Sequence, residues 1–297
     1  MNRRLGWFEP LPQATDLPVL LPTAERRAPR SPAELWSGLP RIRLRAWHGL
    51  ALGLVFTLSA GFAEAQTGAG RPSVVATLIK WTPLLFSGFL FNIAISVLAM
   101  AGGTAVGIFL GLGQIARRAP VRGVAWLVTH FFRNAPWLVL LFFCMYLLPF
   151  QVTVFGTTVP LPDWVKATFG LALPVMANVA EIVRGAVQSI PSAQWESAAA
   201  LAFTRRQIIW MIILPQGMKR MLPPWMNLYA ILAMDTVLAS IVGVNEVMTL
   251  TGDALGAESR PELLLPFYSY ILIWFFLYCY PIALWTTRLE RRFAVDR

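Results

Sequence analysis

Long apolar runs separated by short polar segments dominate this chain. Five runs are long enough to consider, and they cover residues 84–115, 126–150, 164–183, 224–244 and 263–285. A bilayer core about 30 Å thick requires roughly 20 apolar residues per spanning helix. Only helices and closed barrels satisfy the backbone hydrogen-bonding groups in lipid. Because the runs have the residue content of helices, the pattern predicts an all-α membrane protein with five core helices.

The region before the first of these runs divides into two parts. Residues 1–46 are rich in proline and show no hydrophobic period, so they are expected to form a flexible cytoplasmic tail. An apolar run at 47–62 then follows a basic flank and precedes Ala-Glu-Ala at 63–65. It is either an extra N-terminal membrane helix or a displaced, cleaved signal-like segment, and we favour the helix. In both cases the linker up to residue 80 is expected in the periplasm.

Composition supports the membrane assignment and argues against nucleic acid as a partner. The chain is 57% hydrophobic and 13% charged, whereas soluble domains average about 25% charged residues. The net charge of +10 does not indicate nucleic-acid binding, because no basic patch with interleaved aromatic residues stands outside the apolar runs. Cys144 and Cys279 both lie in apolar runs, without the spacing of a metal site or a disulfide framework.

Basic residues alternate from loop to loop and give the orientation. The segment after 84–115 carries three arginines and no acid, and further basic residues follow 164–183 and 263–285. The alternate segment 246–262 is acidic. Since Lys and Arg gather in cytoplasmic loops, the polar segment 188–215 and the C-terminus are predicted to be cytoplasmic.

The segment from Glu196 to Pro215 carries a spaced motif with the sequence ESAAALAFTRRQIIWMIILP. It resembles the cytoplasmic coupling loop of ABC importer permeases, whose pattern is E-A-A, three residues, G, nine residues, I-x-L-P. The positions that match are Glu196, Ala198, Ile212, Leu214 and Pro215. Ser197 replaces the first alanine of the pattern, and Ala202 replaces its glycine.

Other motifs extend the resemblance along the chain. Residues 180–196, 132–136 and 220–224 look like segments of the polar amino-acid uptake branch of this permease family. The resemblance covers 84–292 and implies the transmembrane domain of a type I ABC importer in the bacterial inner membrane. It implies a permease subunit that imports amino acids, paired with a second permease, identical or similar. A periplasmic solute-binding protein and a cytoplasmic ABC ATPase dimer are the other implied partners.

No nucleotide-binding motif accompanies this family pattern. The chain has no G-x-x-x-x-G-K-[ST] sequence, so it is expected to need no cofactor of its own. The resemblance implies instead that ATP and magnesium are bound by the partner ATPase, and that this chain is a transport subunit without catalytic residues.

The coupling loop also has a physical interpretation. Ser192 is a suitable N-cap for a short helix covering 195–203, with Glu196 near its N-terminus and Pro215 ending the segment. Alanine disfavours φ > 0, so the turn at Ala202 is expected to differ from that of the family. An ordinary amphipathic linker helix is the alternative. The residues assigned to ATPase coupling are Gln194, Trp195, Glu196, Ala198, Ala199, Ala202, Arg205, Ile212, Leu214 and Pro215.

Glycines recur at every fourth position in the first run. Gly103, Gly107 and Gly111 share one face of the expected helix. Small residues at this spacing allow another helix to approach closely. The stripe predicts helix packing, either inside the subunit or between paired subunits.

Two polar groups inside the apolar runs are candidates for the transport path. Asp235 costs several kcal/mol at this depth if unpaired, and it attracts a substrate ammonium, lines the passage, or pairs with another helix. Thr236 and Ser240 are one turn apart and are expected to share a face of the helix, although Met234 stands where the family has lysine. Glu181 and Arg184 are spaced for an ion pair, which we interpret as a gate brace or interface element.

Two other functional classes remain as alternatives. A secondary transporter driven by an ion gradient would need several intramembrane acids as relays, and Asp235 alone is weak support. A membrane anchor or assembly subunit without transport would not need Asp235 and Thr236. No grouping of residues suggests a hydrolase or a metal site.

Overall fold

The computed structural model describes residues 46–66, 71–154 and 157–293. These residues belong to one compact unit, Arg45–Arg297. The predicted tail at 1–46 lies outside the described residues except for its last position.

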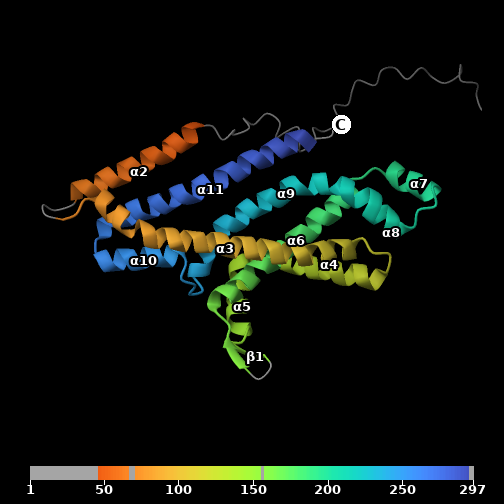
Figure 1. Ribbon diagram of the computed structural model, residues 1–297, viewed down its shortest axis with the longest axis horizontal. Helices are drawn as coiled ribbons and strands as arrows, with labels where there is room; N and C mark the ends of the chain where they lie inside the picture. The colour runs from red at the N-terminus through yellow and green to blue at the C-terminus, as the bar shows by residue number, and fades with distance from the viewer. Residues whose placement is uncertain (1–45, 67–70, 155–156, 294–297) are drawn as a thin grey trace, which may run out of the picture. The chain divides into compact units, whose positions relative to one another are not determined.

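The described chain is mostly helical, as predicted, with one β-hairpin (Figure 1). The hairpin joins β1 (Gln151–Val154) to β2 (Thr157–Pro160) and was not expected from the sequence. The α-helices are α2 (Ala46–Gln66), α3 (Val74–Gln114), α4 (Ala119–Asn134), α5 (Trp137–Leu147), α6 (Asp163–Gln188), α7 (Ser192–Ala200), α8 (Arg205–Gln207), α9 (Leu214–Asp235), α10 (Val247–Glu258) and α11 (Leu264–Phe293). Three further described segments are helical but not α-helical. The π-helix is η2 (Ile208–Ile213), and the 3-10 helices are η3 (Thr236–Ser240) and η4 (Pro261–Leu263).

Four described helices are long and apolar enough to cross a membrane, and a bent pair supplies a fifth possible span. The pair is α4 and α5, which meet at 105° inside the predicted run 126–150. Ala135 between them is extended, with φ −75° and ψ 136°. The residue before a proline avoids the α conformation, so Pro136 explains the break.

The main core lies between α3 and α6. Gly103, Gly107 and Gly111 face α6, where a Cβ atom on each would come within 2.5 to 2.6 Å of the chain. The atoms in the way belong to Val175, Met176 and Val183. The three glycines therefore allow two helices of the same chain to pack at backbone distance.

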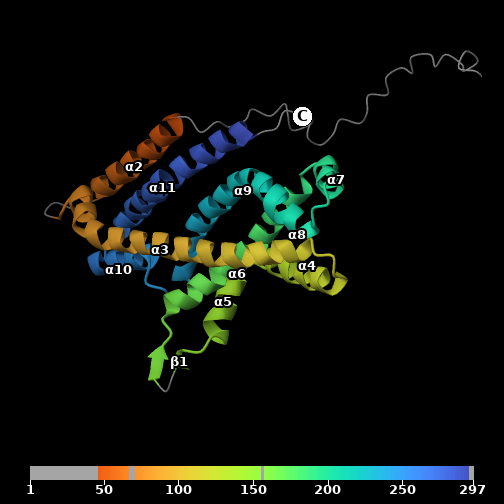
Figure 2. The ribbon, with the colours of Figure 1, turned by 45° about the vertical axis from the view of Figure 1, so that its right-hand side comes forward.

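A second core joins α2, α3, α10 and α11. Leu85 and Phe89 of α3 pack there with Val247 and Phe267. Helix α2 lies alongside α11 in both ribbon views (Figure 1, Figure 2), and the Phe56 ring lies 6.2 Å from that of Tyr270.

The helical path runs on through Pro215, where the sequence suggested an end. Arg205 begins a stretch that continues through the π-helical η2 into α9 and as far as Asp235. Pro215 occupies the second position of α9. The helical path is wider directly before Pro215, where the Leu214 amide donates to the Ile209 carbonyl five residues back, and this π-helical turn accommodates the proline.

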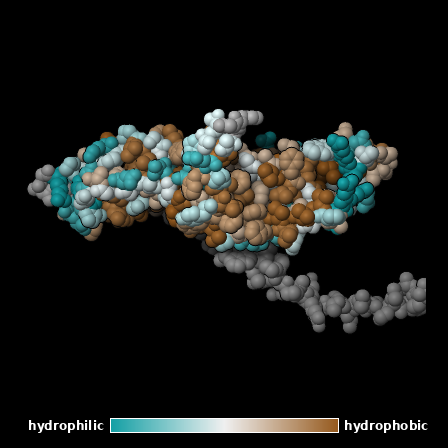
Figure 3. All heavy atoms as spheres, turned by 90° about the horizontal axis from the view of Figure 1, so that it is seen from below, coloured by the Kyte–Doolittle hydropathy of each residue, from teal (hydrophilic) through white to brown (hydrophobic). Residues whose placement is uncertain are grey.

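Apolar side chains also cover much of the outside of this unit. Phe109 is 74% exposed, Tyr146 79% and Trp285 62%. Figure 3 shows such residues across the visible face, with hydrophilic residues gathered toward the two ends. A surface of this kind is suited to lipid contact rather than to water.

Candidate functional site

Helix α7 connects the C-terminal end of α6 to α8. The cap position before it is Pro191, and Ser192 is the first helical residue rather than the N-cap expected from the sequence. Pro191 has the extended backbone that a cap position requires, so the helix starts one residue earlier than an N-cap at Ser192 predicts. Glu196 is consequently in the middle of the helix and not near its N-terminus.

Helix α7 ends at Ala200, earlier than the predicted limit at residue 203. Ala202 has φ 60°, in the left-handed region. The Phe203 amide donates to the Ala198 carbonyl at 3.2 Å, and the Ala202 amide donates to the Ala199 carbonyl at 3.0 Å. These two bonds form a Schellman motif, which usually has glycine at the left-handed position. The alanine adopts that conformation at a cost of about 1 kcal/mol.

The predicted coupling residues divide into an exposed set and a buried set. Ala198 is only 3% exposed and packs with Ile190, Ile208 and Ile213, so its predicted place on a docking surface is wrong. Trp195, Ile212 and Leu214 are partly buried against the same cluster. The exposed members are Gln194, Glu196, Ala199, Ala202 and Pro215.

Two arginines tie this region to the ends of the core helices. Arg205 donates from Nη2 to the carbonyl of Ile115, the C-cap of α3, at 2.9 Å. Arg220 donates from Nη1 to the carbonyl and hydroxyl oxygens of Ser189, the C-cap of α6, at 2.6 and 2.9 Å. These hydrogen bonds link the segment 188–215 to the end of α3 through Arg205 and to α9 through Arg220.

The contact between α7 and the core helices is incomplete. A cavity of about 330 Å³ lies between Trp195 and Arg205 on one side and Gln114 and Gln188 on the other. Within the described residues, the Gln114 side-chain oxygen is buried without a hydrogen-bond partner. Because close packing would resist movement, this cavity leaves α7 room to shift.

A larger cavity of about 580 Å³ lies between α6 and α9. Pro224, Leu228 and Ile231 contribute to its wall from α9. Their spacing places them on one stripe of the helix, and Asp235 continues the stripe by one turn beyond Ile231. Asp235 is half-buried and no hydrogen bond or ion pair to it is found in the described part of the chain.

Charged side chains line the other side of the same cavity. Glu181 accepts two hydrogen bonds from Arg184, at 3.1 Å from Nε and 2.8 Å from Nη2. Arg133 of α4 is a second ion-pair partner, with its Nη1 3.3 Å from the Glu181 carboxylate. The spacing of three in the sequence thus corresponds to a bidentate pair within α6, and Arg133 joins it from a second helix, α4.

Thr236 and Ser240 follow Asp235 in a turn of 3-10 helix rather than in an α-helix. With three residues per turn, positions four apart point about 120° apart, so the predicted shared face is wrong. The Thr236 hydroxyl donates to the Ala233 carbonyl at 2.8 Å, and the Ser240 hydroxyl to the Val237 carbonyl at 2.7 Å. Thr236 is fully buried, so it is not open to the cavity.

The sequence did not predict a buried polar network that includes Thr236. Asn92 of α3 donates to the Thr236 hydroxyl at 3.1 Å and to the Glu246 carboxylate at 2.8 Å. Glu246 in turn caps α10 by accepting from the Met248 and Thr249 amides. Burial raises the pKa of Glu246, and the bond from Asn92 offsets part of that change. An Asn inside an apolar run was the available signal.

Comparisons with known proteins agree with this architecture. Residues 103–295 match the family described as binding-protein-dependent transport system inner membrane component. The chain is 29% identical to the L-cystine transport system permease protein TcyB of Bacillus subtilis (strain 168) over 226 residues, covering 73% of this chain and 93% of that protein. It is 29% identical to the glutamine transport system permease protein GlnP of Escherichia coli (strain K12), over 72% of this chain and 94% of that protein.

Solved structures show the same fold. A crystal structure of an amino acid ABC transporter with histidines matches with a TM-score of 0.62 and 26% identity, covering 72% of this chain and 96% of that chain. An inward-facing MetNI methionine ABC transporter matches with a TM-score of 0.58 and 19% identity, over 73% of this chain and 99% of that chain. The predicted fold of an ABC importer transmembrane domain is confirmed.

The match extends over most of the described helices and covers the whole of α6 to α9. The protein is an ABC transporter permease subunit, a membrane component without an enzymatic role. The chain belongs to the family of binding-protein-dependent transport system inner membrane components.

Proposed function

We propose that this permease imports amino acids into the cytoplasm. The observation that carries the proposal is the near full-length similarity to permeases named for cystine and glutamine transport. The similarity to the amino acid ABC transporter structure, at 26% identity, supports the same substrate class. The amino acid itself would be chosen largely by the periplasmic binding protein that delivers it.

The transport path follows the stripe of α9 that faces the cavity. Asp235 is the one member of the stripe with a charge, and a carboxylate held at this depth without a partner favours a cation. The ammonium group of an amino acid supplies that cation. Asp235 is thus the substrate-facing residue. The next residue, Thr236, is held in place by a hydrogen bond from Asn92.

Glu181 and Arg184 form the inner end of the path. Arg133 of α4 also contacts the Glu181 carboxylate, so two helices, α4 and α6, meet at this group. Separating α4 from α6 would break the Arg133 contact and leave the pair within α6 intact. The cluster thereby acts as a gate brace that responds to movement between helices.

The partners follow from the family and from the exposed surface of α7. An ABC ATPase dimer, which binds ATP and magnesium, docks on the side chains of Gln194, Glu196 and Ala199. This assigns α7 and the C-terminus to the cytoplasm, in keeping with the basic residues nearby. A second permease, identical or similar, completes the pathway, and a binding protein approaches the opposite side.

ATP-driven closure of the partner moves α7 and thereby the bundle. The bond from Arg205 transmits the displacement to the end of α3, and the bond between Ser189 and Arg220 transmits it to α9. Helices α3 and α6 are locked together by the glycine stripe, so they move as one body. Because α9 packs less tightly on α6 across the 580 Å³ cavity, the movement opens or closes that cavity.

Reconstitution tests the proposal most directly. The permease, its ATPase and its binding protein are placed in liposomes, and uptake of labelled glutamine and cystine is measured with and without ATP. We expect ATP-dependent uptake. Uptake that follows a proton gradient and ignores ATP would identify a secondary transporter, and normal assembly without uptake would identify an anchor.

A charge substitution tests the docking surface separately. Glu196→Lys should abolish co-purification of the ATPase while membrane insertion is unchanged. Glu290→Lys on exposed α11 is the matched control and should retain the ATPase. If both variants retain it, Glu196 has no part in docking.

A further inference from the structure

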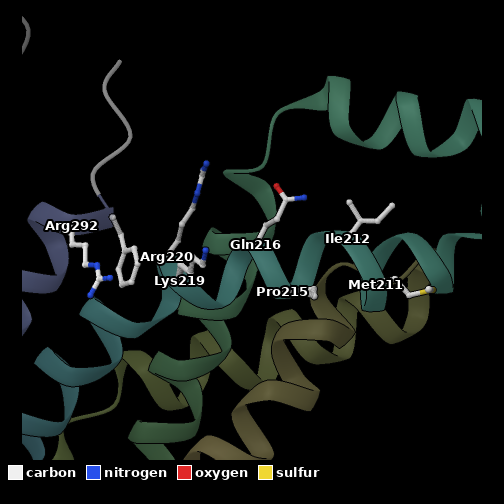
Figure 4. Close-up of a pocket in the computed structure, with 8 residues that line it drawn as sticks. Met211, Ile212, Pro215, Gln216, Lys219, Arg220 and Arg292 are labelled. Atoms are coloured by element: carbon white, nitrogen blue, oxygen red, sulfur yellow. The ribbon is translucent and has the colours of Figure 1, made fainter.

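A cavity of about 720 Å³ opens between the start of α9 and the end of α11 (Figure 4). Lys219 and Arg220 line it from α9, and Arg292 and Phe293 line it from α11. Pro215 and the neighbouring η2 residue Met211 form an apolar side. Arg220 also lines the 580 Å³ cavity between α6 and α9, whereas Lys219, Arg292 and Phe293 line only this one of the two, and the transport mechanism above does not use those three.

The cavity carries three positive charges without a counter-charge. No acidic residue is among those that line it, and Lys219, Arg220 and Arg292 form no ion pair within the described part of the chain. One nitrogen of Arg220 is occupied by Ser189. Three like charges close together repel one another, so an anion bound among them is stabilised.

The positions of these three basic residues in the sequence place their charges at a membrane boundary. Lys219 and Arg220 come just before the predicted apolar run at 224–244, and Arg292 comes just after the run at 263–285. Cations placed at this level face the phosphate groups of the bilayer. Basic pockets between helices on the cytoplasmic side are suited to anionic lipid headgroups.

Exposed apolar side chains continue from the cavity along both helices. Met218 is 66% exposed and Leu222 is 39% exposed on the face of α9 that starts at Pro215. Trp285 of α11 is 62% exposed and lies two turns before Arg292. A free anion would use the cations alone, whereas a phospholipid would use both the cations and this apolar surface.

We propose that this cavity binds the phosphate-bearing headgroup of an anionic phospholipid, with its acyl chains along the apolar surface of α9 and α11. The leaflet follows from the orientation proposed above, and the binding itself does not depend on it. Because Pro215 and Arg220 belong to the junction between η2 and the bundle, a bound lipid would hold that junction to α11.

Lipid binding to the purified permease–ATPase complex tests the proposal. Native mass spectrometry measures the binding of dioleoylphosphatidylglycerol, with zwitterionic dioleoylphosphatidylcholine, which has no net charge, as the comparison. We expect the double variant Lys219→Gln/Arg292→Gln to bind phosphatidylglycerol about thirtyfold more weakly, given the usual contribution of each basic residue at an anionic surface. Arg117→Gln/Arg118→Gln removes the same charge from another exposed loop and should bind like the parent.

Four outcomes would overturn the proposal. Equal binding of the two lipids, or equal binding by the two double variants, would show that the cavity does not bind the anionic headgroup. Displacement of phosphatidylglycerol by millimolar inorganic phosphate would show a free-anion site without acyl selectivity. Loss of lipid on ATPase binding would show that the partner covers the cavity.

A second measurement avoids dependence on variant folding. A phosphatidylglycerol analogue with a photoreactive diazirine on its acyl chain is crosslinked to the unmodified complex, and labelled peptides are identified. We expect labelling at Met218 or Leu222. Labelling confined to other helices contradicts the assignment, while transport assays decide the proposed function independently.

Discussion

The α3–α6 interface and the coupling segment 188–215 use small residues for opposite purposes. At the interface, Gly103, Gly107 and Gly111 are buried and the opposing valines leave no room for a Cβ. In α7, Ala199 is exposed and Ala198 beside it is buried. Small residues thus allow two helices to pack closely at the α3–α6 interface. On the exposed side of α7 they leave space for another protein to approach. The difference predicts which substitutions damage folding and which damage only coupling.

The largest expected effect is at the glycine stripe. Gly107→Val would bring a Cβ to 2.6 Å from the Met176 carbonyl oxygen and 2.7 Å from Val179. Because the obstructing atom is backbone, we expect destabilisation of about 3 kcal/mol or loss of folded protein. Folded yield in detergent extracts, measured by size-exclusion chromatography, checks this. Gly102→Val, where nothing lies within 4 Å, should be tolerated. Equal yields of the two variants would contradict the close packing of α3 on α6.

Adjacent alanines in α7 give the next effect. Ala198→Leu should lower stability by about 1 to 3 kcal/mol, because its surroundings are already filled by Ile190 and Ile213. Ala199→Leu should leave the melting temperature nearly unchanged and weaken ATPase association. Thermal unfolding and co-purification of both variants separate the two roles. The reverse pattern would mean that α7 is turned the other way.

A smaller effect is expected where the segment is attached to α3. Arg205→Gln removes the charged hydrogen bond to the Ile115 carbonyl, and we expect a loss of about 1 kcal/mol in stability. ATP hydrolysis should then continue with less uptake for each ATP consumed. Arg206→Gln is the control, since Arg206 is exposed. An unchanged ratio of uptake to hydrolysis in Arg205→Gln would exclude this arginine from coupling.

The smallest effect concerns the turn itself. Ala202→Gly removes a Cβ from a residue at φ 60°, and should stabilise the protein by about 0.5 to 1 kcal/mol. The change leaves the Schellman hydrogen bonds in place, so ATPase association should be retained. A rise in melting temperature is the expected result, and a fall would show that alanine is not strained there.

The sequence predicted the helices better than it predicted their breaks. The runs at 84–115, 164–183 and 263–285 correspond to α3, α6 and α11, because a long apolar stretch has few alternatives in a membrane. The bend at Ala135 and the passage of the helix through Pro215 depend on local backbone geometry around prolines. Both prolines were visible, but their effects differ with position in the turn.

The candidate site was predicted in part for a similar reason. Glu181 and Arg184 lie within one turn of each other, so their pairing follows from spacing. Asn92 and Glu246 are far apart in the chain, and nothing in a single sequence connects them. The burial of Ala198 also depends on Ile208 and Ile213 folding back onto α7, which periodicity within α7 does not show.

The length of α3 has a further consequence for the membrane around the protein. From Leu84 to Gln114, beyond Pro83, the helix rises about 46 Å, against about 30 Å for the hydrocarbon core. Even at 40° of tilt, the upper end of the usual range, it would rise about 35 Å. At every usual tilt the helix is therefore longer than the hydrocarbon core and reaches into the headgroup region, so the thickness of the bilayer biases its tilt. Since the far end of α3 is the carbonyl that Arg205 holds, acyl-chain length becomes a mechanical input to coupling.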